Sequence, residues 1–179
     1  IANFAGSSDQ VPGVVNSSLA VAAAGVFVAL KSTLDPGGAV NEGVFRPIAL
    51  RAPEGSIVNV RSDAPAGAHG EVRKRAVSVA LGCLSQIVPE LVSGDLCGTS
   101  FPNSIGGIGG VRKRPYVYYE VPAGGNGGFQ EADGSSAFVN VDFGNIRSIH
   151  TAEHLESEMP LLVERTFLRT DSGGSGAHR

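Results

Sequence analysis

The chain has 179 residues, a length that fits one domain or one lobe of a larger subunit and that suffices to bury a core. Hydrophobic residues make up 42% and charged residues 17%, so disorder over most of the length is excluded. The net charge of -3 gives no reason to expect a nucleic-acid partner, and no apolar stretch reaches the roughly 18 to 20 residues that a membrane span needs.

The glycine and proline contents predict the kind of loops in the chain, and the cysteine content indicates the compartment of the cell. The 25 glycines and 10 prolines lie in short runs, which predicts many irregular, turn-built loops. Cys83 and Cys97 are the only cysteines, and their surroundings do not suggest the disulfide framework of a secreted protein. We therefore expect a cytoplasmic protein.

The beginning of the chain predicts a short strand and a buried helix. Residues 1–4 are expected to form the strand, and turn-forming residues follow it. Asn16 or Ser17 is expected to cap a helix over 18–32. The side chains of this helix are small and apolar almost all round, which is typical of a helix covered on most sides.

Two short strands and a second helix are expected next. The strands are predicted at 48–52 and 57–60, on either side of a turn. In the helix, apolar residues recur at steps of three and four along one face, and Pro89 is expected to bend or end it. The expected face consists of Val72, Ala76, Val77, Ala80, Leu81, Leu84, Ile87, Val88 and Leu91.

The second half of the chain is richer in glycine and in β-forming residues. Glycine-rich stretches at 98–110 and 124–128 are expected to be loops. The elements expected here are strands at 115–121, 137–142 and 161–168, and a helix from 151 to 158 that Thr151 caps. The whole pattern predicts an α+β fold, with a mixed sheet, two long buried helices and glycine-rich loops.

A glycine run at 106–110 and a histidine pair resemble binding motifs. Glycine backbones can turn amides toward a phosphate, but Lys113 is followed by Arg114 and a strand instead of Ser or Thr and a helix, so a hairpin-like connection is the default interpretation.

His150 and His154 could face one metal, but the glutamate that directly follows the first histidine in zinc proteases is missing, and a solvated helix face is the alternative. We predict no metal ligand.

Charged residues form three local clusters. The basic triplets at 73–75 and 112–114 could face phosphate, but such triplets more often mark a solvated helix face or turn. In the third cluster, Glu42 and Arg46 lie around a turn and could orient a carboxylate- or amide-bearing ligand, with Arg46 as the bidentate group. An internal ion pair between Glu42 and Arg46 that fixes the turn is an equally open alternative.

Several stretches spread over the chain carry a resemblance. They are NFAGSSDQVPG (3–13), NSSL (16–19), NEGVFRPI (41–48), APEGS (52–56) and DSGGSG (171–176). In this order they resemble the later half of the hydantoinase B/oxoprolinase family. GGNGG (124–128) and EMPLLVE (158–164) are most similar to the branch that includes acetophenone carboxylase.

The resemblance implies an enzyme of paired subunits or fused lobes, in which an A-type part phosphorylates the substrate with ATP and a B-type part completes ring hydrolysis or carbon dioxide addition. This chain would be part of an ATP-dependent hydrolase of a hydantoin, oxoproline or lactam. The alternatives are a subunit of an ATP-dependent ketone carboxylase, or a non-catalytic scaffold lobe of either enzyme. The predicted substrate-binding residues are Glu42, Arg46, Gly124, Gly125 and Asn126, and no catalytic residue is identified.

The sequence departs from the family in its metal ligands. B-type proteins carry them in an earlier half, in patterns such as His-x-x-Asp and His-His-x-Asp, which are absent here. The resemblance therefore implies a divalent metal in a missing half and ATP with Mg on a partner subunit, with no cofactor bound by this chain. Ile1 in place of methionine and the glycine-rich turn before Arg179 also suggest a cut from a longer polypeptide.

The expected organisation is a single lobe over residues 1–179 that works with other polypeptides. The expected partners are a hydantoinase A-type ATP-binding subunit, the remaining half of the B-type subunit and a small-molecule substrate. Neither nucleic acid nor a membrane is expected as a partner. A scaffold role would require a contiguous apolar patch on the surface of the isolated chain.

Overall fold

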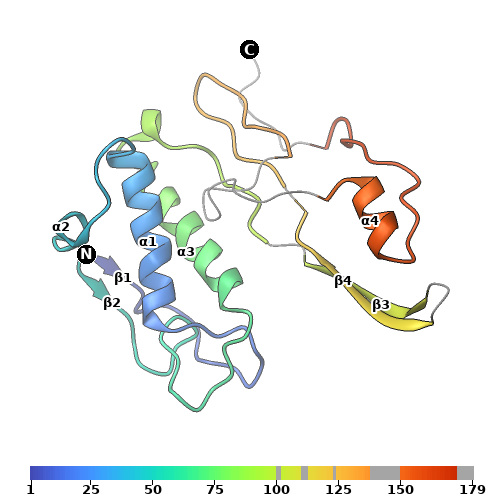
Figure 1. Ribbon diagram of the computed structural model, residues 1–179. Helices are drawn as coiled ribbons and strands as arrows, with labels where there is room; N and C mark the ends of the chain where they lie inside the picture. Colours follow the sequence, from blue (N-terminus) through green and yellow to red (C-terminus); the bar gives the residue numbers. More distant parts are fainter. Residues whose placement is uncertain (100–101, 110–112, 123, 138–149, 173–179) are drawn as a thin grey trace.

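A computed structural model arranges the chain around two helices (Figure 1). The residues that it describes are 1–99, 102–109, 113–122, 124–137 and 150–172. Helices α1 (Leu19–Leu34) and α3 (His69–Leu84) lie side by side and supply most of the core. Within the described ranges, the buried apolar residues are Ala22, Val26, Ala29, Val58, Val72, Ala76, Val77, Leu81, Leu84, Val92 and Leu96.

Gly25 permits the close approach of the two helices. A β-carbon at this position would lie 2.7 Å from the carbonyl oxygen of Arg73 and 2.9 Å from the β-carbon of Ala76. The predicted burial of the helices is confirmed, since no residue between 21 and 31 is exposed and most of the predicted face of α3 that lies within the helix is buried.

Lys74 contradicts the interpretation of the basic triplet at 73–75 as a solvated face. Lys74 is only 1% exposed, whereas the side chain of its neighbour Arg75 is 60% exposed. Successive residues of a helix are rotated by about 100°, so the members of a triplet cannot all lie on one face. The triplet therefore spans the edge between the core and the surface.

The first two predicted strands are confirmed at shorter length. β1 (Ala2–Asn3) and β2 (Leu50–Arg51) form a parallel two-stranded sheet. The short helix α2 (Glu42–Phe45) precedes β2, and its Phe45 ring stacks on Phe27 of α1 with centroids 4.6 Å apart. The strand predicted at 57–60 is wrong, because the backbone there forms turns and isolated bonds to the N-terminal segment instead of a ladder.

The second long helix ends earlier than its apolar pattern suggested. α3 stops at Leu84, and a 3-10 turn, η1 (Pro89–Leu91), follows after a short connection. Pro89 stands at the start of this turn, as its missing backbone N–H allows. Ile87, which the pattern assigned to the buried face, lies beyond the end of α3 and is 76% exposed.

The second half is built on an antiparallel hairpin of β3 (Asn103–Gly109) and β4 (Arg114–Glu120). The strand predicted at 115–121 is confirmed. The glycine run before it was expected to be a loop, but it forms the other strand of the hairpin. The run therefore belongs to a hairpin, as the default interpretation had it, but it forms a strand of the hairpin and not the connection between the strands. It is not a phosphate-binding loop before a helix.

A short helix follows the hairpin, and two strand predictions remain to be compared with the structure. α4 (Ala152–Glu158) begins after Thr151, whose hydroxyl accepts a hydrogen bond from the backbone N–H of His154 at 3.3 Å, so the predicted cap is confirmed. Of the strand predicted at 137–142, all but the first residue lies outside the described residues. The strand predicted at 161–168 is wrong, since this segment pairs with no strand in the described part.

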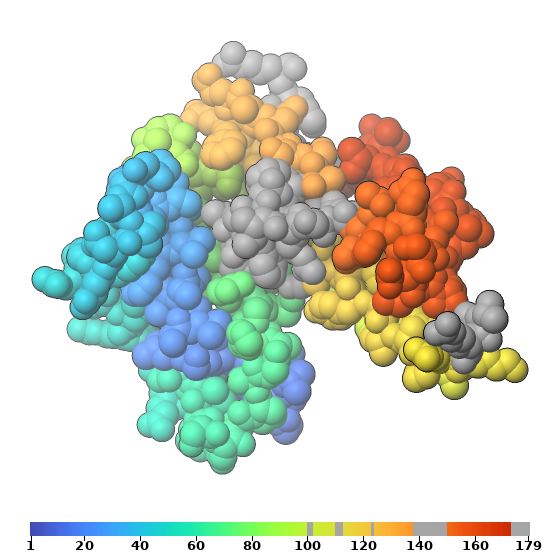
Figure 2. Space-filling view, viewed as in Figure 1, coloured from blue at the N-terminus to red at the C-terminus, as the bar shows by residue number. Residues whose placement is uncertain are grey.

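The elements confirm the α+β class, with one parallel and one antiparallel sheet of two strands each in the described ranges. Figure 2 shows α1, α2 and α3 (blue to green) on one side of the molecule and the hairpin and α4 (yellow to red) on the other. None of the described residues after Thr99 is buried. In the part of the chain that was searched, no helix has the length and apolarity of a membrane span.

Candidate functional site

A hollow of about 440 Å³ lies between the N-terminal turn and α3, and we call it the N-terminal hollow. Phe4, Val72 and Ala76 are among its apolar lining residues. Glu71 and Arg75 bring charged groups to it. A volume of this order and a mostly apolar lining with a few polar groups are typical of small-molecule sites.

One wall of the N-terminal hollow is fixed by backbone hydrogen bonds between distant segments. The N–H of Gln10 donates to Gly55 at 2.8 Å, the N–H of Ile57 to Ser8 at 2.9 Å, and the N–H of Ser17 to Ile57 at 2.8 Å. Gly55 has a φ of 81°, a conformation that favours glycine. The stretches at 3–13 and 52–56, which carry the family resemblance, therefore lie against each other, and the wall consists of residues of the first stretch together with Ile57 and Val58.

Asn16 holds this wall together from the inside. It is fully buried, and its side-chain oxygen accepts a bond from the N–H of Val11 at 2.9 Å. Its amide nitrogen donates to the carbonyl oxygens of Val11 at 2.8 Å, Gly13 at 2.9 Å and Pro65 at 2.7 Å. Both ends of the amide are thus satisfied by the two loops that flank the hollow.

The prediction that Asn16 or Ser17 caps α1 is wrong. The N-cap is Ser18, and its side chain makes no cap bond. Asn16 is occupied by the loops, while the buried Ser17 hydroxyl donates to the carbonyl oxygen of Ser18 at 3.1 Å. Both residue types suit a cap and a buried loop contact equally well, and their tertiary surroundings decide between the two.

The charged side of the N-terminal hollow comes from Glu71 and Arg75, one turn apart on α3. Arg75 Nη1 lies 3.9 Å from Asp95 Oδ2, and the two side chains are 60% and 57% exposed. An exposed pair at this distance contributes little to stability, so the guanidinium can exchange it for a carboxylate or carbonyl of a ligand. The sequence indicated Arg75 only as part of the basic triplet at 73–75 and did not indicate Glu71, although their four-residue spacing on a helix is a local signal.

The predicted ligand residues Glu42 and Arg46 lie elsewhere, on α2. Both are exposed, and no ion pair joins their side chains among the contacts of the described residues. The backbone N–H of Arg46 donates to the carbonyl oxygen of Glu42 at 2.9 Å instead. A hollow of about 510 Å³ beside α2 is lined by Phe27, Lys31 and Phe45 but not by either predicted residue.

The predicted Gly124, Gly125 and Asn126 form part of a packed loop. The N–H of Cys97 donates to Gly125 at 3.0 Å, and the N–H of Asn126 donates to Ser135 at 3.1 Å. A β-carbon on Gly124 would clash with the side chain of Cys97. This loop lies against the segment after η1, so within this chain the five predicted residues belong to two separate surfaces.

The histidine pair lies on the surface at the start of α4. The rings of His150 and His154 are stacked, with centroids 5.0 Å apart, and both residues are exposed. No group of three or more His, Cys, Asp and Glu side chains suited to a metal was found in the described ranges. The donor set of these residues therefore does not fit a metal centre.

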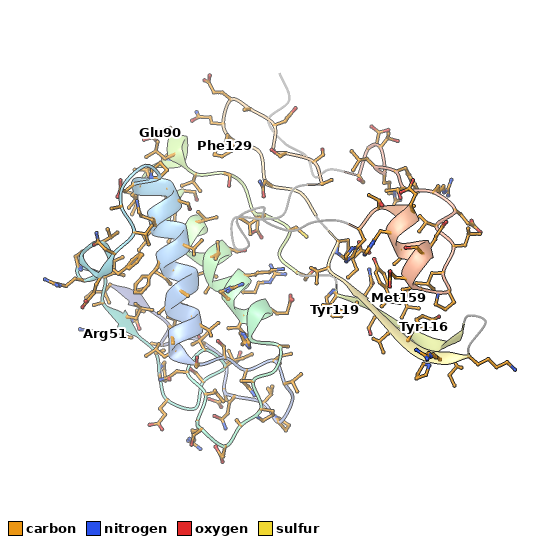
Figure 3. The ribbon with its side chains drawn as sticks, viewed as in Figure 1. Arg51, Glu90, Tyr116, Tyr119, Phe129 and Met159 are labelled. Carbon is orange, nitrogen blue, oxygen red and sulfur yellow. The ribbon has the colours of Figure 1, made fainter. Side chains whose placement is uncertain are left out.

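A second hollow, of about 710 Å³, lies between the hairpin and α4. Figure 3 shows Tyr116 of β4 and Met159, just after α4, in this region, and both line the hollow. Arg114, Glu156 and Glu158 bring charged groups to it. Its polar, open lining distinguishes it from the more apolar N-terminal hollow.

Tyr118 on β4 titrates far from its ordinary range. Burial, together with a hydrogen bond to Glu120 and the charge of that carboxylate, raises the pKa of Tyr118 to about 12. A raised pKa in the folded state means that its contribution to stability is fully present below the unfolded pKa of about 10 and is lost as the pH rises toward 12.

Glu120→Gln is therefore expected to lower the pKa of Tyr118 toward its ordinary value, because the variant removes the negative charge that disfavours tyrosinate. The ultraviolet absorbance of tyrosinate measures this in a background with Tyr116→Phe and Tyr119→Phe, so that Tyr118 alone titrates. The control is Glu131→Gln, which removes a carboxylate from an exposed loop and should leave the titration unchanged. An unaltered pKa in Glu120→Gln would contradict the prediction.

Comparison with known proteins decides the family. A model of the family described as hydantoinase B/oxoprolinase matches residues 1–179, the entire chain. The chain belongs to the hydantoinase B/oxoprolinase family. The resemblance seen in the sequence is thus confirmed.

Relatives within the hydantoinase B/oxoprolinase family are much longer than this chain. An uncharacterized protein of Methanocaldococcus jannaschii is 32% identical over 99% of this chain, which spans 30% of its length. The B-type subunit of a putative D-/L-hydantoinase from a Pseudomonas species is 30% identical over 85% of this chain, and 5-oxoprolinase 1 of Arabidopsis thaliana is 28% identical over 99%. This chain spans 25% and 13% of these two proteins.

Solved structures carry the same fold. The ATP-dependent caprolactamase of Pseudomonas jessenii matches 94% of this chain with a TM-score of 0.81 and 28% identity, and this chain covers 30% of it. A nucleotide-free acetone carboxylase matches 89% of this chain with a TM-score of 0.71 and 22% identity, and 22% of that protein is covered. The second likeness shows the fold alone.

Proposed function

We propose that this chain is part of an ATP-dependent enzyme that opens a cyclic amide, namely a hydantoin, an oxoproline or a lactam. The observation that carries the proposal is the likeness to the ATP-dependent caprolactamase, because it combines 28% identity with a shared fold over 94% of the chain. The names of the hydantoinase and 5-oxoprolinase relatives support the same reaction class.

The chemistry explains why such an enzyme uses ATP. A ring amide is a stable group without a good leaving group, and phosphorylation supplies one whose developing charge cationic groups can stabilise. We propose that an A-type subunit binds ATP with Mg and carries out the phosphorylation. The rest of a B-type polypeptide would hold a divalent metal, since the described residues of this chain offer no group of three or more side chains suited to one.

Within this chain we propose the N-terminal hollow as a substrate-binding wall. Its apolar lining suits the ring of a substrate, and Arg75 suits a carboxylate or carbonyl oxygen on it. Glu42 and Arg46 are a second candidate contact, on a different surface. The working location proposed for the complex is the cytoplasm.

A ketone carboxylase is the second candidate function. The stretches at 124–128 and 158–164 favour it, because they are most similar to the branch that includes acetophenone carboxylase. The likeness to acetone carboxylase, at 22% identity, adds a shared fold. A purely structural lobe is the third candidate, and the exposed apolar residues of the second half are the observation in its favour.

The reaction class can be tested by substrate-dependent ATP turnover. The chain is combined with an A-type subunit and the remaining B-type polypeptide, and ADP release is measured with hydantoin, 5-oxoproline and caprolactam in turn. We expect at least one cyclic amide to stimulate ADP release and to yield the ring-opened acid. Stimulation by acetone with bicarbonate, and by none of the amides, would favour the carboxylase instead.

Arg75→Ala is expected to raise KM for the stimulating amide about tenfold, which corresponds to about 1.4 kcal/mol of lost binding. Steady-state ADP release measures it. Arg51→Ala, which removes an exposed arginine from β2 outside the N-terminal hollow, is the matched control and should leave KM unchanged. Unchanged kinetics in Arg75→Ala would exclude the N-terminal hollow, and unchanged kinetics in Arg46→Ala would exclude the α2 surface.

A further inference from the structure

The hairpin exposes one apolar face. Along β4, Tyr116 and Tyr118 are half-buried, whereas Val117 is 68% exposed and Tyr119 59% exposed. Directly paired residues of an antiparallel ladder share a face, and Ile108, which pairs with Pro115, is 75% exposed. Ser104 and Gly106 on this face are exposed as well. The apolar side chains of this face are those of Ile108, Pro115, Val117 and Tyr119, and we call them the outer face.

The opposite face of the hairpin is partly covered from within the chain, although Ile105 on that face is 46% exposed. Pro160 packs so closely on Gly109 that a β-carbon there would clash with it, and Tyr116 lies over Gly107. Met159 and Tyr116 lie between the hairpin and α4, as Figure 3 shows, while Tyr119 lies further along the strand. The described part of this chain therefore covers the hairpin only in part: Pro115 and Val117 border the hollow beside α4, and the outer face stays exposed.

A hairpin of this kind needs a second cover to be stable. Two strands alone are marginally stable in water, and three strands or a packed layer are needed to hold them. The second half has no core of its own in the described ranges, since every buried residue in those ranges lies before Cys97. Its β-branched and aromatic side chains are suited to burial and are exposed instead.

The comparison with the caprolactamase bears on what could cover the outer face. Residues 1–99 are little more than half of the chain, so a match over 94% with a TM-score of 0.81 must include the hairpin half. The hairpin thus takes the same position in a protein of which this chain covers 30%. That protein therefore contains polypeptide beyond the stretch that this chain matches.

We propose that the outer face docks onto the part of a hydantoinase B-type polypeptide that this chain does not span. The inference rests on the proposed function only in that both require this further polypeptide. It assigns the contact to apolar side chains of the hairpin and not to the N-terminal hollow. The partner surface should be apolar at its centre, because Ile108, Val117 and Tyr119 offer no charge.

Co-purification tests the docking without ATP or substrate. The tagged chain is co-expressed with the part of the Methanocaldococcus jannaschii relative outside the stretch that matches this chain, and the amount of co-purified partner is measured. We expect a one-to-one complex with the wild-type chain. Val117→Lys should lower the amount at least fivefold, and Tyr119→Lys should do the same.

Val40→Lys is the matched control, because Val40 is 73% exposed and lies next to α2, away from the hairpin. It should leave the complex unchanged, and far-UV circular dichroism should show all three variants folded. No complex with the wild-type chain, or equal amounts with Val117→Lys and Val40→Lys, would overturn the docking. A homodimer of the chain that Val117→Lys dissociates would also overturn the docking, in favour of a second copy of the chain as the partner.

The docking and the proposed function can fail separately. A complex that forms but shows no amide-dependent ATP turnover would contradict the proposed function and leave the docking intact.

Discussion

Replacing Asn16 with aspartate is expected to lower the free energy of unfolding by about 3 to 5 kcal/mol. The substitution keeps the shape of the side chain but removes the amide nitrogen that donates to Val11, Gly13 and Pro65. It also places a carboxylate against these carbonyl oxygens at a fully buried position. Urea denaturation at neutral pH measures the change.

The loss should depend on pH in a specific direction. Burial among carbonyl oxygens raises the pKa of the introduced carboxyl, so the difference from the wild type should shrink as the pH falls toward the ordinary value of about 3.9. Asn41→Asp is the matched control, since Asn41 is exposed and precedes α2 as its N-cap, where aspartate is well tolerated. A similar small effect of both substitutions would contradict the role of Asn16 in holding the loops.

Gly25→Ala is expected to destabilise the chain by about 1 to 3 kcal/mol, although alanine is the better helix former. The reason is the helix contact, because a β-carbon would lie 2.7 Å from the carbonyl oxygen of Arg73 and 2.9 Å from the β-carbon of Ala76. The helices would have to separate, which loosens the core between them. Thermal or urea denaturation measures the loss.

Gly82→Ala provides the control with the opposite sign. Gly82 lies in α3, is exposed, and has no atom within 4 Å of where a β-carbon would stand. Alanine there should raise the stability by about 0.5 to 1 kcal/mol through its helix propensity. A gain in both variants would show that α1 and α3 are not in close contact at Gly25.

The elements with a strong local signal were predictable. The apolar character of α1, the three- and four-residue spacing of α3 and the β-forming residues of β4 all depend on neighbours in sequence. The Thr151 cap is also local, because donor and acceptor are three residues apart. The prediction at 161–168 had the same β-propensity but no strand beside it in the described part, and a strand needs a partner.

The N-terminal hollow was not predictable from local patterns, for a physical reason. Glu42 and Arg46 were predicted to bind a ligand because they are close in sequence, and the structure places them at the two ends of an exposed short helix. The N-terminal hollow is lined by residues about 50 positions apart, such as Ser7 and Ile57. A glycine strand such as β3 was also missed, since glycine signals a loop until its partner strand is known.

The sequence by itself determined the α+β class, the two long helices, one strand of the hairpin and the hydantoinase B/oxoprolinase resemblance, because periodicity, propensity and ordered motifs reside in neighbouring residues. The tertiary structure alone decided that Asn16 joins two loops, that Lys74 is buried beside an exposed Arg75, and that the predicted ligand residues lie on two surfaces. It also left the outer face of the hairpin exposed within the described ranges. These features depend on contacts between distant segments, whose geometry no local pattern encodes.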